Sequence, residues 1–324
     1  MSEFDLIKRY FTRATPGAEL GVGDDAALLR VAPGMELAVS TDMLVSGTHF
    51  FADADPSLLG CKTLAVNLSD MAAMGAVPRW GLLSLSLPAA NEAWLQKFSE
   101  GFFAMAQQHG VELIGGDTTR GPLNLCVTIM GELPHGAALR RSGAQPGDEI
   151  WVSGTLGDAA LALAHLQGRV QLAEADLAGC AARLHQPQPR VALGLALRGL
   201  ANSAIDISDG LLADLGHILE CSGRGAEIRL EALPVSPILR SLPPASAKKG
   251  GSGLAMHCAL AGGDDYELCF TAPAKRRQEI ERLSGELNLP LTRIGVIVSG
   301  SGCVVHAADG SVIETRESGY DHFA

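Results

Sequence analysis

Apolar residues in the first half of the chain recur with two different spacings, one typical of helices and one typical of strands. After Asp55, a possible helix N-cap, the helical spacing continues to a stop at Gly75, so a helix is predicted over residues 56–75. A second helix is predicted from Asn91 to Gly110 on the same grounds. The remaining apolar stretches predict strands at residues 36–42, 80–87, 111–114 and 123–129.

The second half restarts after residues 134–148, a stretch rich in Gly, Pro, Arg and Ser. We place a domain boundary in this stretch, which divides the chain into residues 1–137 and 138–324. The pattern beyond it predicts strands at 149–153, 226–230 and 291–298 and helices at 158–166, 191–201, 208–222 and 275–287. Residues 243–253, rich in Pro, Ser, Gly and Lys, predict a mobile surface loop. Mixed strands and helices in both halves predict an α/β (α+β) protein of two domains.

The composition narrows the class of protein. A chain of 324 residues with 47% hydrophobic and 19% charged residues can bury a sizeable core, which excludes disorder as its main state. Its 25 basic and 36 acidic residues give a net charge of −11, so nucleic acid is not expected as a principal partner. The N-terminus is too charged for a signal peptide and no apolar run of about 18 residues follows, so no membrane segment is expected. The seven cysteines form no C-x-x-C pair, which favours reduced thiols in a cytoplasmic protein.

Aspartate beside glycine, serine or threonine is the feature that carries chemistry. Six short segments share it: residues 23–26, 40–42, 67–70, 115–118, 206–210 and 262–265. One such segment alone is typical of a turn or a helix cap. Several of them directly follow strand-like stretches, however, so we expect their carboxylates to lie together at strand ends. At an effective dielectric of about 20, two like charges about 4 Å apart cost on the order of 4 kcal/mol, so such a cluster needs cations.

The ligand chemistry favours magnesium ions on a polyphosphate. Oxygen ligands, without His or Cys at metal-binding spacing, favour Mg²⁺ over Zn²⁺. Mg²⁺ usually binds through one or two carboxylates together with substrate phosphates, so many aspartates indicate several ions on a polyphosphate. The neighbouring glycines let backbone N–H groups approach phosphate oxygens closely. Because no lysine lies in a G-x-x-x-x-G-K-[ST] loop, the sequence predicts a nucleotide site without that loop.

In their order along the chain, these aspartate segments resemble those of the thiamine-monophosphate kinase family. The resemblance continues through residues 141–144, 146–148 and 266–268 and reaches 319–323, so it spans nearly the whole chain. It implies transfer of the γ-phosphoryl group of ATP to thiamine monophosphate, which gives thiamine diphosphate and ADP. It also implies the two-domain fold of the aminoimidazole ribonucleotide synthetase superfamily. In that fold the N-terminal domain binds ATP and Mg²⁺ and forms a β-barrel at a homodimer interface, and the C-terminal α/β domain folds over the nucleotide.

The resemblance also assigns roles to individual residues. The positions of the family's magnesium ligands correspond to Asp25, Ser40, Thr41, Asp42, Asp70, Asp117, Asp206 and Asp209. The positions near ATP correspond to Gly116, Asp117, Arg141 and Ser208. The positions near the thiamine moiety correspond to His49, Asp264 and Tyr320, and at Asp264 the family often has the longer glutamate. Without the resemblance, His49 and Arg141 are equally typical of surface residues, and Tyr320 of a residue that seals an apolar seam.

The acceptor's own chemistry simplifies the expected mechanism. A phosphate monoester has a second pKa of about 6, so at neutral pH its attacking oxygen is already largely anionic and needs no strong general base. The sequence accordingly offers no Ser/His/Asp or Cys/His arrangement to nominate as nucleophile or base. We expect direct in-line transfer, in which the metal ions and Arg141 neutralise charge in the transition state.

Two alternatives stay open at the level of sequence. One is a sibling enzyme of the superfamily, such as selenophosphate synthetase or the hydrogenase-maturation dehydratase. It is disfavoured because the nucleophiles of those enzymes are missing: the first cysteine, Cys61, lies in a predicted helix, and the chain ends in Phe323-Ala324. The other is a non-catalytic sensor of a magnesium nucleotide or of thiamine phosphate, which would bind without releasing ADP.

Overall fold

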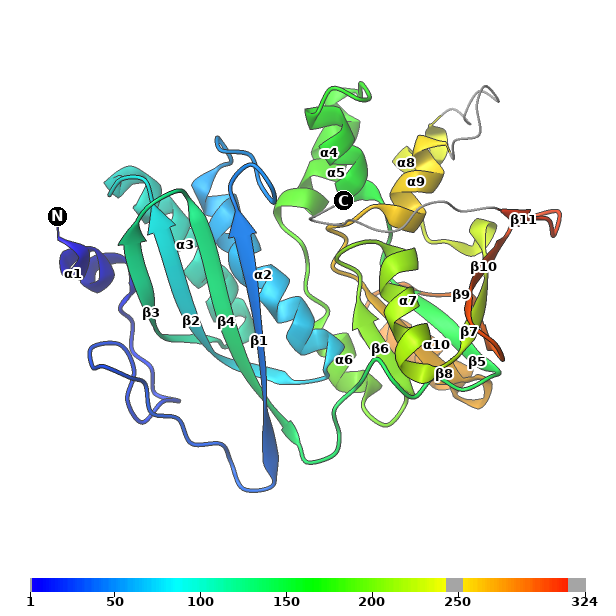
Figure 1. Ribbon diagram of the computed structural model, residues 1–324, viewed down its shortest axis with the longest axis horizontal. Helices are drawn as coiled ribbons and strands as arrows, with labels where there is room; N and C mark the ends of the chain where they lie inside the picture. The colour runs from blue at the N-terminus through cyan, green and yellow to red at the C-terminus, as the bar shows by residue number, and fades with distance from the viewer. Residues whose placement is uncertain (1, 243–252, 314–324) are drawn as a thin grey trace. The chain divides into compact units, whose positions relative to one another are not determined.

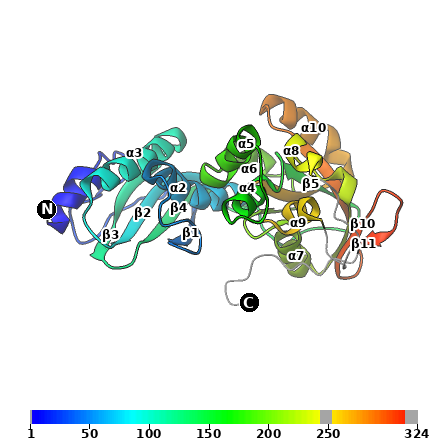
Figure 2. The same cartoon turned by 90° about the horizontal axis from the view of Figure 1, so that it is seen from above.

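The computed structural model describes residues 2–242 and 253–313, and the chain divides into two compact units. The first unit comprises Met1–Met71 and Ala76–Ala138, and the second comprises Ala72–Gly75 and Leu139–Ala324. Each unit contains its own β-sheet with helices packed against it (Figures 1 and 2). Both units therefore combine strands and helices, as the sequence pattern predicts.

A four-stranded sheet forms the centre of the first unit, with the strand order β1-β4-β2-β3. Its strands are β1 (Met35–Val45), β2 (Val77–Leu87), β3 (Glu112–Arg120) and β4 (Asn124–Pro134). Strand β4 pairs antiparallel with β1 and β2, whereas β3 runs parallel to β2. The sheet is open, with β1 and β3 as its edges. Among the described residues of this one chain it does not close into a barrel.

Two helices, α2 (Pro56–Ala73) and α3 (Glu92–His109), cover one face of this sheet (Figure 2). The predicted caps define where they begin and end. Asp55 Oδ1 accepts the N–H of Ser57 at 2.9 Å, and Asn91 accepts that of Trp94 at 3.1 Å. Gly110 ends α3 in the left-handed conformation with φ 66°. At the N-terminus, α1 (Glu3–Leu6) leads into a short π-helical segment, η1 (Ile7–Phe11).

The second unit is built on a seven-stranded mixed sheet. Its strand order is β11-β10-β7-β9-β5-β8-β6, and only β7 and β10 pair in parallel. The strands are β5 (Asp148–Ser153), β6 (Ser203–Asp206), β7 (Gly225–Arg229), β8 (Leu268–Pro273), β9 (Leu291–Val298), β10 (Gly302–His306) and β11 (Val312–Ile313). All six residues of β5 are buried, as expected for a strand with neighbours on both sides.

Helices surround this second sheet (Figures 1 and 2). They are α4 (Asp158–Leu166), α5 (Glu174–His185), α6 (Val191–Leu197), α7 (Leu211–Ser222), α8 (Pro237–Ser241), α9 (Leu254–Ala261) and α10 (Arg277–Glu286), with short 3₁₀ turns η2 (Leu230–Ala232) and η3 (Ala274–Arg276). The sheet and the apolar faces of α4, α5, α7, α8 and α9 share one core of mainly Leu, Ile, Val and Ala side chains. This core fixes the strand ends from which the candidate site residues emerge.

Some elements differ from the sequence predictions. Strand β3 extends to Arg120, well beyond the predicted residues 111–114, because its polar second half pairs with β2. Helix α7 begins at Leu211 and not at residue 208, and α6 ends at Leu197. The sequence pattern also missed the helices α1, α5, α8 and α9 and the strands β6, β8, β10 and β11. The predicted surface loop falls almost entirely on residues 243–252, which lie outside the described residues.

Candidate functional site

Three candidate metal ligands lie between β1 and α2 in the first unit. Ser40 Oγ donates a hydrogen bond to Asp70 Oδ2 at 2.6 Å, which joins the strand to the helix. The N–H of Asp42 donates to Asn67 Oδ1 at 3.1 Å. Since side chains alternate along a strand, Ser40 and Asp42 face α2 together. Asn67 is itself buried and fixed by a hydrogen bond to Thr63 O, so this group has a rigid support.

Thr41 points to the opposite face of β1. Its Oγ1 donates to Val127 O at 3.0 Å and lies 3.2 Å from Thr128 Oγ1, both on the neighbouring strand β4. Thr128 lines a cavity of about 960 Å³ on this face of the sheet. The first unit therefore holds its candidate ligands on two faces: Ser40, Asp42 and Asp70 on the helix-covered face, and Thr41 on the other.

The cavity on that second face collects further predicted residues. Asp25, Gly116 and Asp117 line it together with Asp24, and the N-terminal side chains Phe4, Ile7 and Phe11 contribute an apolar wall. Gly116 has φ 147°, and a Cβ at this position would lie 1.9 Å from Leu83 O. Only glycine fits there, because the backbone of β2 lies directly beside this position. A cavity with an apolar wall and exposed carboxylates is typical of a ligand site.

In the second unit, residues 206–210 form a tight turn between β6 and α7. The N–H groups of Ser208, Asp209 and Gly210 all donate to Asp214 Oδ2, at 3.0, 3.1 and 3.2 Å. Burial raises the pKa of Asp214 to about 7, against the effect of these three donors. Asp214 was not among the predicted site residues. Its signal in the sequence is an acidic residue in the first turn of α7, which is also common at ordinary helix N-termini.

The loop between α9 and β8 lies against this turn. The N–H of Asp264 donates to Ser208 O, and that of Tyr266 to Ile207 O, each at 2.8 Å. Asp264 and Tyr266 have positive φ angles of 67° and 49°, a conformation uncommon outside glycine. A Cβ on Gly263 would lie 2.5 Å from Ser208 O, so the two segments are in close contact. The structure thus brings together Ser208, predicted near ATP, and Asp264, predicted near the thiamine moiety.

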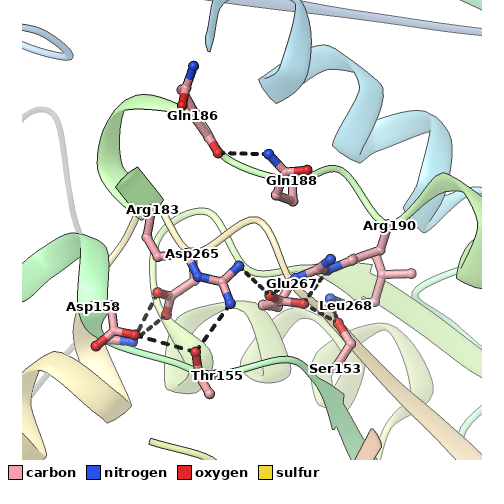
Figure 3. A network of polar contacts seen from close by, with 11 residues as sticks. Ser153, Thr155, Asp158, Arg183, Gln186, Gln188, Arg190, Asp265, Glu267 and Leu268 are labelled. Atoms are coloured by element: carbon pink, nitrogen blue, oxygen red, sulfur yellow. Dashed lines mark hydrogen bonds and ion pairs between the residues drawn. The ribbon is translucent and has the colours of Figure 1, made fainter. Parts of the chain in front are cut away.

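Two acidic residues of this loop are anchored in the interior (Figure 3). Both carboxylate oxygens of Asp265 accept the N–H of Gly157, at 2.9 and 3.0 Å, at the start of α4. Burial raises the pKa of Asp265 well above its usual range, and the nearby carboxylates of Glu267 and Asp158 add to this shift. Glu267 accepts hydrogen bonds from Ser153 and Arg190. These contacts anchor the loop through its two buried carboxylates.

The remaining predicted residues lie elsewhere. His49 follows β1, and its Nδ1 accepts the N–H of Val45 at 3.0 Å, which places the proton of the neutral ring on Nε2. Arg141 is exposed in the second unit, and its carbonyl oxygen accepts a hydrogen bond from Ser222. Asp206 ends β6 and is 6% exposed. Tyr320 lies outside the described residues.

The predicted carboxylates have the right chemistry for magnesium but stand in separate groups. In residues 2–242 and 253–313, no three His, Cys, Asp or Glu side chains lie close enough together to hold a metal ion. The donors that are present, carboxylate and hydroxyl oxygens, are those that Mg²⁺ prefers. All seven cysteines are free, and Cys180, Cys258 and Cys269 are buried. None of the described helices has the length and apolar character needed to cross a membrane.

Comparisons with known proteins match both halves of the chain. The model of the AIR synthase related protein N-terminal domain matches residues 23–133, and that of the C-terminal domain matches residues 145–308. Thiamine-monophosphate kinase from Escherichia coli (strain K12) is 49% identical over 327 residues, which cover 99% of this chain and 98% of that protein. The fold prediction of two AIR synthase-like α/β domains is thereby confirmed.

Solved structures give the same result. The crystal structure of thiamine-monophosphate kinase from Stenotrophomonas maltophilia K279a matches with a TM-score of 0.85 and 51% identity, covering 97% of this chain and 98% of that one. A structure of AaThiL complexed with AMPPCP and TMP matches with a TM-score of 0.77 and 31% identity, covering 99% of this chain and 96% of that one. Identity of about half along nearly the whole chain favours the thiamine-monophosphate kinases over the sibling enzymes that share this fold. The chain belongs to the thiamine-monophosphate kinase family of AIR synthase related proteins.

Proposed function

We propose that this protein transfers the γ-phosphoryl group of ATP to thiamine monophosphate and releases thiamine diphosphate and ADP. The observation that carries the proposal is the 49% identity to the Escherichia coli thiamine-monophosphate kinase along practically the whole chain. The AaThiL structure, which holds AMPPCP and TMP, supports the same pair of substrates. The seven free cysteines are in keeping with the cytoplasmic location that forms part of the proposal.

Each unit would contribute different groups to the reaction. ATP is assigned to Gly116 and Asp117 of the first unit and to Arg141 and Ser208 of the second. Thiamine monophosphate is assigned to His49, Asp264 and Tyr320. The residues assigned to several Mg²⁺ ions are Asp25, Ser40, Thr41, Asp42, Asp70, Asp117, Asp206 and Asp209. The support for this set is the donor chemistry, since carboxylate and hydroxyl oxygens suit a hard cation that also binds phosphate.

Positioning and charge neutralisation would supply most of the catalysis. Bound Mg²⁺ would neutralise phosphate charge, which is the usual role of the metal in phosphoryl transfer. The acceptor phosphate is already anionic at neutral pH, so no protein base is assigned and the transfer is direct and in line. Arg141 is assigned to the charge that develops on the transferred group. The exposed backbone around Gly116 offers N–H donors to the nucleotide phosphates.

A homodimer is the oligomeric state that we propose. Strand β1 is an edge strand, and its alternating residues Leu37, Val39 and Met43 are 40%, 56% and 56% exposed. Natural edge strands are normally protected by charge or by a covering element, so an exposed apolar row favours pairing with another copy. Two such four-stranded sheets facing each other would make the shared barrel that the family resemblance implies.

A turnover assay tests the reaction itself. The purified protein is incubated with ATP, Mg²⁺ and thiamine monophosphate, and the products are separated by chromatography. Thiamine diphosphate and ADP in equal amounts are expected. Binding of both substrates without ADP release would identify a sensor instead. A stable phosphorylated protein after incubation with ATP alone would contradict the in-line mechanism.

Asp42→Asn and Asp70→Asn test the metal assignment. Each variant removes one negative charge from the group between β1 and α2, so magnesium-dependent turnover should fall by about 100-fold or more, as when a transition-state charge partner is removed. Circular dichroism should show an intact fold. Asp53→Asn, an exposed aspartate outside the group, is the control and should keep its rate. Near-normal rates in both test variants would count against the assigned metal site.

A further inference from the structure

Glu267 carries a carboxylate that the proposed reaction does not use, although its side chain is only 1% exposed. Arg190 donates to both of its oxygens, from Nε to Oε2 at 2.6 Å and from Nη2 to Oε1 at 2.5 Å. Ser153 Oγ donates to Oε2 at 2.6 Å, and Arg183 Nη1 lies 3.5 Å from Oε1 (Figure 3). A two-point arginine–carboxylate pair of this kind fixes direction as well as distance.

This pair joins the start of β8 to two helices. Arg190 directly precedes α6 and Arg183 lies in the last turn of α5, while Glu267 stands one residue before β8. Ser153 closes the arrangement, because its Oγ also accepts the N–H of Leu268 at 2.9 Å. The backbone that follows Tyr266 is therefore held at two points, the side chain of Glu267 and the N–H group of Leu268.

The held segment is the loop that carries Asp264. Its two positive φ angles, at Asp264 and Tyr266, are conformations that persist only where the surroundings over-determine them. In front, the loop is hydrogen-bonded to the carbonyls of Ser208 and Ile207, and the carbonyl of Glu267 accepts the N–H of Ile207 at 2.8 Å. Behind it stands the Glu267–Arg190 pair. Removal of that rear support would free the loop to relax toward ordinary backbone angles.

We propose that Glu267 and Arg190 are positioning residues for thiamine monophosphate, which act by holding the Asp264 loop in its binding conformation. This inference rests on the proposed function, because it takes Asp264 as a contact of the thiamine moiety. That moiety is remote from the reacting phosphate, so its contacts are made equally in the ground state and in the transition state. Their loss raises KM for thiamine monophosphate and leaves kcat nearly unchanged.

The nucleotide side has its own anchor. Asp214 holds the N–H groups of Ser208, Asp209 and Gly210, and none of these bonds involves Glu267 or Arg190. Loosening the Asp264 loop should therefore leave the KM for ATP within about twofold of the wild-type value. A rise in the KM for thiamine monophosphate without a rise in the KM for ATP indicates positioning. A general loss of folded protein would instead lower the rate with both substrates alike.

The chain offers a closely matched control in Glu149. Its side chain is 5% exposed, it accepts from Arg277 Nε at 3.0 Å, and Arg293 Nη1 lies 3.5 Å away. Like Glu267, it is a buried carboxylate of the second unit that contacts two arginines. Glu149 is the second residue of β5, the strand that ends at Ser153. Its contacts with Arg277 and Arg293 do not involve the Asp264 loop. Substitution of either carboxylate should lower stability, since each removes a buried negative charge that pairs with two arginines.

The experiment compares Glu267→Gln and Arg190→Lys with Glu149→Gln and Arg277→Lys. All four are tested for thermal unfolding and for steady-state kinetics with each substrate varied in turn. Glu267→Gln and Arg190→Lys should raise KM for thiamine monophosphate about tenfold or more, because a displacement of about 1 Å can cost on the order of 100-fold in efficiency. The controls should lose stability but keep both KM values within about twofold.

Either of two results would overturn the inference. They are a KM for thiamine monophosphate in Glu267→Gln that equals that of Glu149→Gln, or equal rises of KM for both substrates. If Glu267→Gln does not fold, Arg190→Lys decides, because it retains the positive charge and loses only the two-point geometry. An inactive wild-type protein would instead reject the proposed function, so the two failures are distinguishable.

Discussion

A single buried carboxylate, Asp214, organises the segment assigned to ATP. Its Oδ2 accepts three consecutive backbone N–H groups, a geometry otherwise used by proteins to bind phosphate or other anions. The anion is thus a part of the protein, and it fixes the turn on which Ser208 and Asp209 stand. Asp214 acts through backbone N–H groups, which nearly every residue type has, so the types of residues 208–210 do not reveal this role.

Asp214→Asn should weaken ATP binding more than the binding of thiamine monophosphate. The amide keeps the shape but accepts less strongly, so the three N–H groups are held more loosely and KM for ATP should rise about tenfold, equivalent to about 1.4 kcal/mol. Steady-state kinetics with each substrate varied provides the measurement. Asp309→Asn is the control, because Asp309 also accepts a backbone N–H, that of Ser311 at 2.9 Å, but in an exposed turn. An unchanged KM for ATP in Asp214→Asn would rule out the anchoring role.

At the residue scale, the sequence identified the candidate site residues better than the residues that hold them in place. Aspartate beside glycine or serine marks Ser208, Asp209 and Asp264 directly, because Ser208 and Asp209 stand in the turn after β6 and Asp264 in the loop before β8. Asp214 and Glu267 could not be identified in this way, since a carboxylate in a first helical turn or before a strand is common in any protein. Their partners, such as Arg190, are distant in sequence, and only the folded chain brings them together.

At the scale of elements, the helices whose ends are fixed by local chemistry were predicted best. The N-caps at Asp55 and Asn91 and the glycine at 110 act within a few residues, so sequence suffices to place α2 and α3. Strand limits depend on partners instead. The polar second half of β3 is a strand because β2 lies beside it, and β8 lies between β5 and β6, to which it pairs. Met74, which falls within the predicted helix at residues 56–75, lies past the end of α2 and is 36% exposed.

Two glycines set the packing of α2 against α3, and Gly101→Ala tests this contact. A Cβ at Gly101 would lie 1.9 Å from Ser57 O, and one at Gly60 would lie 2.1 Å from Phe98 O, so the backbones of the helices are in direct contact. Gly101→Ala should lower the free energy of unfolding by about 1–3 kcal/mol, the usual cost of overpacking. Urea denaturation monitored by circular dichroism gives this value.

The matched control is Gly216→Ala in α7, where a Cβ would meet no atom within 4 Å. Alanine has the higher helix propensity, so this variant should gain about 0.5–1 kcal/mol in unfolding free energy. Opposite signs for the two substitutions are expected. Destabilisation of similar size in both would show that helix propensity or local strain, and not the α2–α3 contact, governs Gly101.

At the scale of the whole molecule, the net charge of −11 takes on a different meaning. It argues against nucleic acid as partner, but part of the excess consists of the aspartates assigned to magnesium. Within the first unit these carboxylates stand on both faces of the sheet, with Asp42 facing α2, Asp70 on α2 itself and Asp117 in the cavity opposite. A cluster of all predicted ligands therefore cannot be formed by the first unit alone. The sequence could indicate which carboxylates belong to the site. It could not indicate on which face of the sheet each one lies, because that depends on strand register.

The exposed apolar row of β1 leads to a prediction about assembly. If two copies meet through Leu37, Val39 and Met43, then Val39→Glu buries a charge without a partner in the interface, and the dimer should dissociate. Sedimentation velocity or light scattering should give a dimer mass for the wild type and a monomer mass for the variant. Val312→Glu is the control: Val312 is an equally apolar strand residue, 61% exposed in the second unit, and its substitution should leave the dimer intact. A monomeric wild type, or a Val39→Glu variant that remains dimeric, would exclude this face as the interface.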